Sequence, residues 1–247
     1  MINILKENER IDDLQIKDLK IIQNTDGFCF GIDSVLLSEF AMDIKKGSKV
    51  IDFGTGTGII SFLLLGKTEI SNVVGIEVQE EVADMARRSI MLNNLGEKFK
   101  IINCDIKDIL DNVNREEFDV VVTNPPYKKA NSGGKNKNEK KLISRHEVLA
   151  DVYDFIKASK SVLKDKGTLY MVHRPERLAD IICALRKYKI EPKKIRFVYS
   201  KEDSNEAKLV MVKAVKNGGE FLQIEKPLYI YKNNGEYTDE VLKIYNK

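Results

Sequence analysis

Short apolar runs alternate with segments of helical periodicity along most of the chain. Five runs rich in Val, Ile and Phe have the length and composition of buried strands, at residues 49–53, 73–77, 99–103, 118–123 and 167–172. Helices are predicted where apolar residues recur at helical spacing, over residues 32–41, 59–65, 80–94, 148–163 and 175–188. Strands that alternate with helices predict an α/β fold with a doubly wound, mostly parallel sheet.

Two further β-rich runs, at residues 195–200 and 208–215, leave little room for a helix between them. They predict an antiparallel C-terminal hairpin at one edge, which brings the expected Rossmann-like sheet to seven strands. We expect a single domain over residues 1–247, with a short N-terminal lead-in (1–45), a core (46–215) and a C-terminal extension (216–247). Asp33 and Ser34 are the expected cap residues of the first helix.

Composition limits the possible environments of the protein. Hydrophobic residues make up 43% of the chain and charged residues 32%, as in a soluble globular protein, and the net charge of +3 is too small to identify a partner. Cys29, Cys104 and Cys183 are widely spaced, which argues against a disulfide framework and a zinc site. No apolar stretch reaches the length of a signal-peptide core or a membrane span. We therefore expect a cytoplasmic monomer that binds neither membrane nor metal.

Glycine and acidic residues follow three successive predicted strands. Gly54, Gly56 and Gly58 form a tight turn, and residues without a Cβ let a ligand approach the backbone closely. Glu77 ends the next strand, about twenty residues further on, where a carboxylate can accept hydrogen bonds from a ribose diol. Asp105 follows the third strand and can accept a hydrogen bond from an adenine amino group. Each feature alone is common in ordinary turns and caps, but their succession at strand ends predicts a nucleotide-like ligand.

A rigid turn follows the predicted strand at 118–123. Pro125 and Pro126 stop the strand because neither can donate a hydrogen bond to a sheet. Asn124 adds an amide that both accepts and donates, and Tyr127 adds a flat aromatic face. These four residues are the groups needed to hold a planar ring that carries an amino group; the plain alternative is a stiff loop with a core tyrosine.

Taken in order, these residues resemble the motif series of class I S-adenosylmethionine-dependent methyltransferases that modify an exocyclic or amide nitrogen. The series comprises Asp52-Phe53-Gly54-Thr55-Gly56-Thr57-Gly58, Glu77, Asp105 and Asn124-Pro125-Pro126-Tyr127. Two flanking segments, residues 27–37 and 144–147, resemble the tRNA1(Val) adenine-37 N6-methyltransferase family. The similarity covers residues from about 23 to 215.

This resemblance implies a cofactor, S-adenosyl-L-methionine, and a set of residues that bind it. The implied cofactor-binding residues are Asp33, Asp52, Gly54, Gly56, Gly58, Glu77, Val78, Asp105, Ile106 and Asn124. The implied catalytic residues are Asn124, Pro125, Pro126 and Tyr127. In this hypothesis the Asn124 side-chain oxygen and the Pro125 carbonyl accept from the substrate amino group, and Tyr127 stacks on the base.

A lysine-rich insert follows the turn. Residues 128–141 contain six lysines and one glutamate. The insert is interpreted either as a solvated loop or as an arm that binds RNA phosphates. The candidate RNA-binding residues are Lys128, Lys129, Lys135, Lys137, Lys140, Lys141 and Arg145. Together with the resemblance, they predict N6-methylation of an adenine in RNA, most specifically adenine 37 of a tRNA anticodon loop.

Four alternatives remain open. A protein glutamine N5-methyltransferase needs the same grip on an amide nitrogen, but members of that family carry a helical domain before the glycine turn, where this chain has only about fifty residues. A DNA adenine methyltransferase usually has a large target-recognition region, and an rRNA guanine N2-methyltransferase typically has Phe at the position of Tyr127. A catalytically silent binder of the same fold is the fourth.

Overall fold

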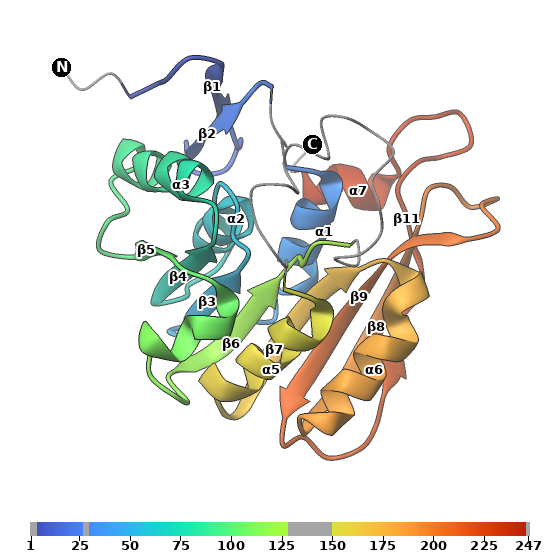
Figure 1. Cartoon of the computed structure of the whole chain (residues 1–247). Coiled ribbons are helices and arrows are strands. Elements are labelled where there is room, and N and C mark those ends of the chain that lie inside the picture. The colour runs from blue at the N-terminus through green and yellow to red at the C-terminus, as the bar shows by residue number, and fades with distance from the viewer. Residues whose placement is uncertain (1–3, 27–29, 128–149, 246–247) are drawn as a thin grey trace.

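The computed structural model describes residues 4–26, 30–127 and 150–245. Its main sheet has nine strands among these residues, in the order β10-β8-β9-β7-β6-β3-β4-β5, with β11 also paired to β8 (Figure 1). Seven of them are long: β3 (Lys49–Phe53), β4 (Asn72–Glu77), β5 (Phe99–Asn103), β6 (Phe118–Thr123), β7 (Leu163–His173), β8 (Ile190–Tyr199) and β9 (Ala207–Lys216). Among the described strands of this sheet only β9 is antiparallel to its neighbours, so the predicted α/β fold is confirmed.

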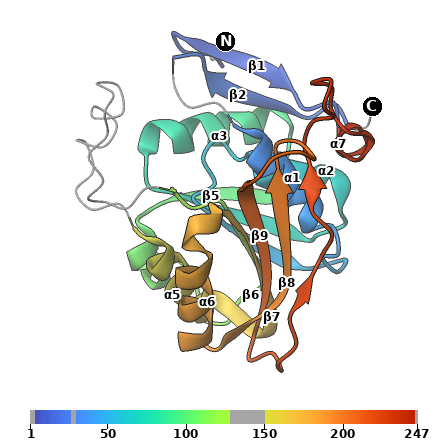
Figure 2. The ribbon, with the colours of Figure 1, turned by 90° about the vertical axis from the view of Figure 1, so that its right-hand side faces the viewer.

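Helices cover both faces of the sheet. They are α1 (Ile32–Phe40), α2 (Ile59–Lys67), α3 (Glu80–Leu92), α5 (Val152–Val162), α6 (Leu178–Lys187) and α7 (Asp239–Ile244), with 3-10 turns η1 (Ile106–Asp111) and η2 (Pro175–Arg177). Figure 2 shows α5 and α6 on one side of the sheet and α1 and α2 on the other. Two hydrophobic clusters result, one on each face. Along β6, Val120 and Val122 belong to the cluster on the α1 side and Val121 to the cluster on the α5 side. Because successive side chains of a strand point to opposite faces and both faces are covered here, consecutive residues of the strand are apolar.

The strand order reverses at β3, and this places the glycine turn beside the proline turn. β4 and β5 lie on one side of β3, while β6 and β7 lie on the other. Phe53, the last residue of β3, is in register with Ile76 of β4 and Thr123 of β6. The turns after these strands therefore meet at one edge, at the switch point where ligands bind in open α/β sheets.

The N-terminal residues form a separate two-stranded antiparallel sheet, which the sequence pattern did not predict. It consists of β1 (Glu9–Asp13) and β2 (Lys20–Asn24). The Asn93 side chain at the end of α3 accepts from the Lys20 backbone N–H at 2.8 Å and donates to its carbonyl at 2.6 Å. Arg88 of α3 pairs with Glu9 at 2.6 Å. The hairpin is thus fastened to α3 and does not simply lead into the sheet.

Several expected boundaries were wrong. The chain enters β7 already at Leu163, so α5 ends at Val162 and β7 is longer than predicted. Pro175 begins a 3-10 turn, and the α-helix starts only at Leu178. The expected caps of α1 are also wrong, because Gly31 occupies the N-cap position and no side chain caps it.

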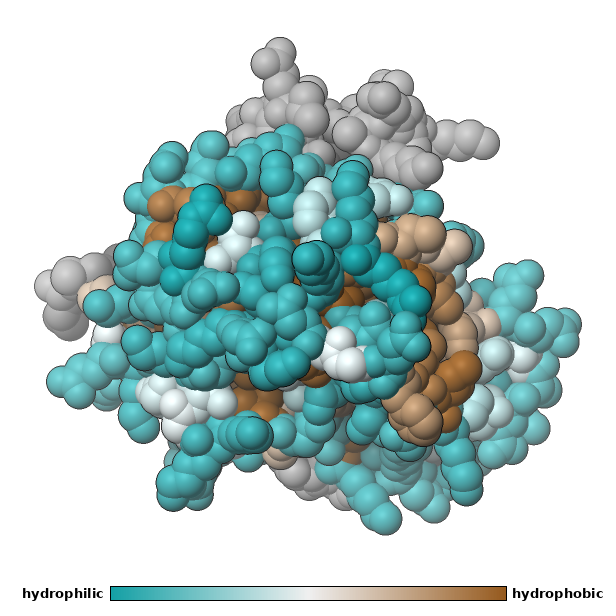
Figure 3. Space-filling view, turned by 90° about the horizontal axis from the view of Figure 1, so that it is seen from below, coloured by the Kyte–Doolittle hydropathy of each residue, from teal (hydrophilic) through white to brown (hydrophobic). Residues whose placement is uncertain are grey.

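The C-terminal extension adds two strands of two residues each and a short helix. β10 (Gln223–Ile224) and β11 (Leu228–Tyr229) pair in parallel with β8, so the expected sheet of seven strands becomes one of nine. Thr238 caps α7 by accepting from the Val241 backbone N–H at 3.3 Å. Viewed from below, at the edge opposite the switch-point turns, the molecule presents mostly hydrophilic residues (Figure 3).

Candidate active site

The turn after β3 places three glycines in the left-handed backbone region. The φ angle is +68° at Gly54, +58° at Gly56 and +93° at Gly58, a region that residues with a Cβ rarely adopt. A Cβ added at Gly58 would lie 3.1 Å from the Phe62 ring and 3.2 Å from the Phe99 ring, so packing also requires glycine there. At Gly56 nothing lies within 4 Å of an added Cβ, and this open space lets a ligand approach the backbone.

Glu77 is held against this turn by backbone hydrogen bonds. Its Oε2 accepts from the Gly56 N–H at 3.0 Å, and its Oε1 accepts from the Gln79 N–H at 2.9 Å. The residue is only 6% exposed. Because a carboxylate oxygen can accept more than one hydrogen bond, a carboxylate fixed in this way can still accept from a ligand hydroxyl.

Asp52 lies beneath the glycine turn, with an exposure of 0%. Its Oδ2 accepts from the Thr55 hydroxyl at 2.7 Å and the Ser61 hydroxyl at 2.8 Å, while Oδ1 has no partner among the described residues. Burial raises the pKa of Asp52 to about 6 against the lowering effect of the two hydroxyls, and the nearby charge of Glu77 adds to the rise. In this structure Asp52 therefore fastens the turn to α2; its expected role in binding the cofactor stays a prediction.

The raised pKa of Asp52 predicts a pH-dependent stability. Between about pH 4, where an exposed aspartate titrates, and about pH 6, the native state binds more protons than the unfolded state. This contribution to stability is therefore complete below about pH 4 and is lost as the pH rises through about 6. The shift corresponds to roughly 3 kcal/mol.

Urea unfolding of wild type and Asp52→Asn across this interval measures the effect. The free energy of unfolding of wild type minus that of the variant should fall by roughly 2 to 3 kcal/mol from about pH 4 to about pH 7. Taking the difference removes the titration of all other groups. A difference that stays flat or rises would contradict the assignment.

The remaining predicted cofactor residues also lie at the switch-point edge. Asp105 is the N-cap of η1, where its Oδ1 accepts from the Lys107 N–H at 2.9 Å. Val78 directly follows Glu77 and is 39% exposed, whereas Ile106 is buried with an exposure of 6%. The edge thus combines acidic acceptors with apolar side chains, although binding by these residues stays a prediction.

The proline turn begins where β6 is tied to β3. The Thr123 hydroxyl donates to the Phe53 carbonyl at 2.9 Å. Asn124 is half-buried, and its amide nitrogen lies 3.5 Å from the Ser34 hydroxyl at the start of α1. Pro125 is buried, and no described residue donates a hydrogen bond to its carbonyl. The Asn124 amide and the Pro125 carbonyl thus follow the end of β6 beside the glycine turn.

Tyr127 is held by groups from two other parts of the chain. Its hydroxyl donates to Asp33 Oδ2 at 2.6 Å. Its ring meets the His173 ring edge-on with centroids 5.2 Å apart, and the Arg174 guanidinium lies 5.1 Å from the ring centroid. Burial raises the pKa of Tyr127, and the negative charge of Asp33 adds to the rise, so the phenol is neutral. Asp33 orients Tyr127 here, which the sequence did not predict.

His173 ends β7 and is fully buried. Its Nδ1 accepts from the Arg174 backbone N–H at 2.8 Å, while its Nε2 has no partner among the described residues. Burial lowers the pKa of His173 to about 4, and the nearby Arg177 lowers it further. The imidazole is therefore neutral at physiological pH, with its proton on Nε2.

The sequence alone assigned no role to His173 or Arg174. The pair directly follows a predicted strand, so the rule that ligand-binding residues gather at strand ends was the available signal. The seven candidate RNA-binding residues, Lys128 to Arg145, lie outside the described residues. His146 lies outside them as well.

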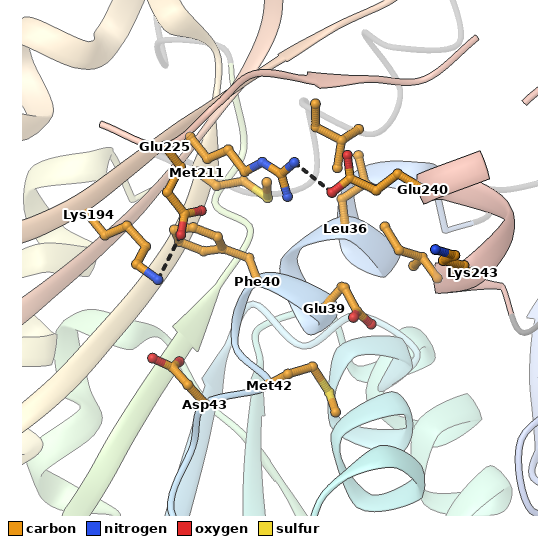
Figure 4. Close-up of a pocket in the computed structure, with 13 residues that line it drawn as sticks. Leu36, Glu39, Phe40, Met42, Asp43, Lys194, Met211, Glu225, Glu240 and Lys243 are labelled. Atoms are coloured by element: carbon orange, nitrogen blue, oxygen red, sulfur yellow. Dashed lines mark hydrogen bonds and ion pairs between the residues drawn. The ribbon is translucent and has the colours of Figure 1, made fainter. Parts of the chain in front are cut away.

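The described chain also contains a cavity of about 410 Å³ away from these turns, between α1, β8 and the C-terminal extension (Figure 4). Its walls are charged, but Lys194 pairs with Glu225 at 2.8 Å and Arg196 with Glu240 at 2.6 Å. These ion pairs join the C-terminal extension to β8. None of the predicted site residues lines this cavity.

None of the helices among the residues that the structure describes is both long and apolar enough to cross a membrane. No three His, Cys, Asp or Glu side chains there come together in a way that would hold a metal ion.

Known proteins resemble this chain in sequence and in fold. One relative, from Flavobacteriaceae bacterium (strain 3519-10), is named tRNA1(Val) (adenine(37)-N6)-methyltransferase and is 26% identical over 158 residues. The match covers 64% of each chain, so this chain spans slightly under two thirds of the relative's length. A relative of the same name from Pedobacter heparinus is 23% identical over 225 residues, covering 91% of this chain and 92% of that one.

A solved structure from Agrobacterium tumefaciens, described as a predicted O-methyltransferase, shares the fold with a TM-score of 0.70 and 20% identity. The superposition covers 87% of this chain and 95% of that one. The methyltransferase small domain family matches residues 31–187, which contain the glycine turn, Glu77, Asp105 and the proline turn. The chain therefore belongs to the methyltransferase small domain family.

Proposed function

We propose that this enzyme transfers the methyl group of S-adenosyl-L-methionine to N6 of adenosine 37 in a tRNA anticodon loop. The observation that carries the proposal is the meeting of two turns at the switch point: a glycine turn with fixed carboxylates, and an Asn-Pro-Pro-Tyr turn that can hold a planar amino group. The names of the relatives from two organisms support adenine 37 as the target. We further propose that the protein acts in the cytoplasm as a monomer.

The residues around the glycine turn fit the cofactor. The open space above Gly56 would admit it close to the backbone, and Asp52 Oδ1 is a buried acceptor without a described partner near the turn. Glu77 would accept from the ribose hydroxyls and Asp105 from the adenine amino group. When bound, the cofactor supplies a methyl group that is already activated by its positive sulfur.

The proline turn would prepare the nucleophile. The adenine N6 is a poor nucleophile because its lone pair is delocalised into the ring. Two acceptors, the Asn124 oxygen and the Pro125 carbonyl, would bind both hydrogens of the amino group and favour a pyramidal nitrogen. Tyr127, oriented by Asp33 at 2.6 Å, would position the base against the reacting methyl group. No strong general base is required, and His173 would be a weak one, because its pKa is lowered to about 4.

The target position suits this site. A base in an anticodon loop is already unpaired, so the enzyme only has to turn it into the pocket and need not open a duplex. A glutamine side chain also offers a planar amide nitrogen to the same turn, and a peptide substrate is therefore the competing outcome.

The test is methylation of total tRNA that lacks this modification, with the methyl donor present, followed by digestion and mass spectrometry of nucleosides. We expect N6-methyladenosine, located at position 37 by fragment mapping. A release-factor peptide bearing the glutamine target serves as the parallel substrate. Methylation of the peptide without any N6-methyladenosine in the tRNA would overturn the proposal.

A further inference from the structure

Arg174 lies directly beside the proposed catalytic turn. It follows the last residue of β7, is exposed to solvent, and places its guanidinium 5.1 Å from the centroid of the Tyr127 ring. One guanidinium nitrogen also donates to the Lys208 carbonyl at 3.2 Å. These contacts hold the side chain at the edge of the sheet where the substrate base is expected.

The charge of Arg174 has no carboxylate partner among the described residues. Six of the other described arginines form ion pairs with Asp or Glu; they are Arg10, Arg87, Arg88, Arg177, Arg186 and Arg196. Besides Arg174, Arg115 is the remaining described arginine without an ion pair, and it precedes β6 at the opposite edge of the sheet. Arg174 therefore presents, beside the catalytic turn, a positive charge that forms no ion pair among the described residues.

A phosphate is the kind of ligand that suits the Arg174 guanidinium. A guanidinium stays charged, rests readily on an aromatic face, and presents a planar fork of donors that matches a phosphate. In a nucleic acid the target base is joined to its own phosphates through one sugar, so a base held at Tyr127 would bring a phosphate close to Arg174. A glutamine side chain in a peptide brings no such anion.

We infer that Arg174 binds a backbone phosphate of the methylated nucleotide and so contributes to the choice of nucleic acid over a peptide glutamine. This inference rests on the proposed function, because it takes an RNA base as the substrate. It assigns the residue a role in binding the substrate; the amino group itself is held by the proline turn.

The experiment compares Arg174→Gln, Arg174→Lys and the matched control Arg115→Gln. Both glutamine variants remove one exposed arginine charge that has no ion pair with another described residue, at opposite edges of the sheet. Methyl transfer to tRNA is measured over a series of salt concentrations, together with the affinity for S-adenosylhomocysteine. Arg174→Gln should raise KM by about tenfold or more with little change in kcat, because a phosphate contact stabilises the bound substrate and the transition state alike.

The salt dependence separates a phosphate contact from a structural role. Arg174→Gln should reduce the slope of log(kcat/KM) against log[salt] by about 0.7, the value for one phosphate of a single strand. Arg174→Lys keeps the charge and should keep the slope, and Arg115→Gln should resemble wild type. An unchanged slope in Arg174→Gln, or an equal reduction in Arg115→Gln, would overturn the inference. Failure of the proposed function is distinguishable, because wild type itself would then methylate the peptide and no tRNA.

Discussion

Asn124→Ala should lower the rate of methyl transfer by roughly 100- to 1,000-fold and leave the affinity for the methyl donor nearly intact. The substitution removes one of the two acceptors proposed for the amino group, and this interaction strengthens as the nitrogen becomes pyramidal in the transition state. Loss of one preorganised group of this kind typically lowers kcat by about 100- to 1,000-fold. Among the described residues its side chain makes a long hydrogen bond, 3.5 Å to the Ser34 hydroxyl, and an interaction with the Tyr127 hydroxyl, so the fold should tolerate its removal.

Single-turnover methylation and calorimetric titration with S-adenosylhomocysteine measure the two properties separately. Asn114→Ala is a suitable control, because Asn114 is an exposed asparagine before β6, at the opposite edge. A large loss of cofactor affinity in Asn124→Ala, or transfer at the wild-type rate, would contradict the role assigned to this residue.

Glu77→Gln should weaken cofactor binding by about 10- to 100-fold. In the native protein both carboxylate oxygens accept from backbone N–H groups, of Gly56 and of Gln79. A glutamine keeps one oxygen but turns an NH₂ group toward the other N–H, so two donors would face each other in a buried position. The same change removes an acceptor proposed for the ribose hydroxyls and loosens the glycine turn.

Titration calorimetry with S-adenosylhomocysteine checks this expectation, with Glu81→Gln as the matched variant. Glu81 is exposed in the first turn of α3 and makes the same charge change without contacting the glycine turn. If Glu77→Gln bound the cofactor as tightly as Glu81→Gln, the carboxylate would have no part in the cofactor site.

The strands of the main sheet and the glycine turn could be predicted from the sequence, because few other structures accommodate their residue patterns. The runs that form β3 and β6 have the predicted boundaries, since strands buried on both faces must be largely apolar. The edge strand β5 also has its predicted boundaries, although its Lys100 and Asn103 are exposed. The left-handed φ angles of the glycine turn were foreseeable as well, because only glycine adopts them without strain.

The N-terminal hairpin escaped prediction because its residues give weak local signals. β1 reads Glu-Arg-Ile-Asp-Asp, so only one apolar residue marks a strand, and Ile11 is itself 38% exposed. The turn between β1 and β2 adopts left-handed φ angles at Gln15, Lys17 and Asp18, without the glycine that usually marks such a turn. Its stability depends on contacts with α3, which local patterns do not contain.

The contacts around Tyr127 also depend on tertiary structure. Asp33 and Tyr127 are 94 positions apart, and only the packing of α1 against the sheet brings them to 2.6 Å. A carboxylate before an apolar helical run normally predicts an N-cap. Asp33 instead lies within the first turn of α1, where its Oδ1 accepts from the Ser34 N–H at 3.0 Å and its Oδ2 accepts from Tyr127. The ends of β6 and β7 were predicted at one edge, but the approach of Arg174 to the Tyr127 ring required the three-dimensional arrangement.

In the proposed function, the Asn-Pro-Pro-Tyr turn holds the amino group of adenine 37 in tRNA while this group receives the methyl group. The most direct measurement is transfer of a labelled methyl group to an anticodon stem-loop of tRNA1(Val) with adenosine at position 37, compared with the same stem-loop carrying inosine, which has a carbonyl in place of the amino group. We expect labelled N6-methyladenosine in the first RNA and no label in the second. Equal labelling of both RNAs, or labelling of a release-factor peptide and neither RNA, would contradict it.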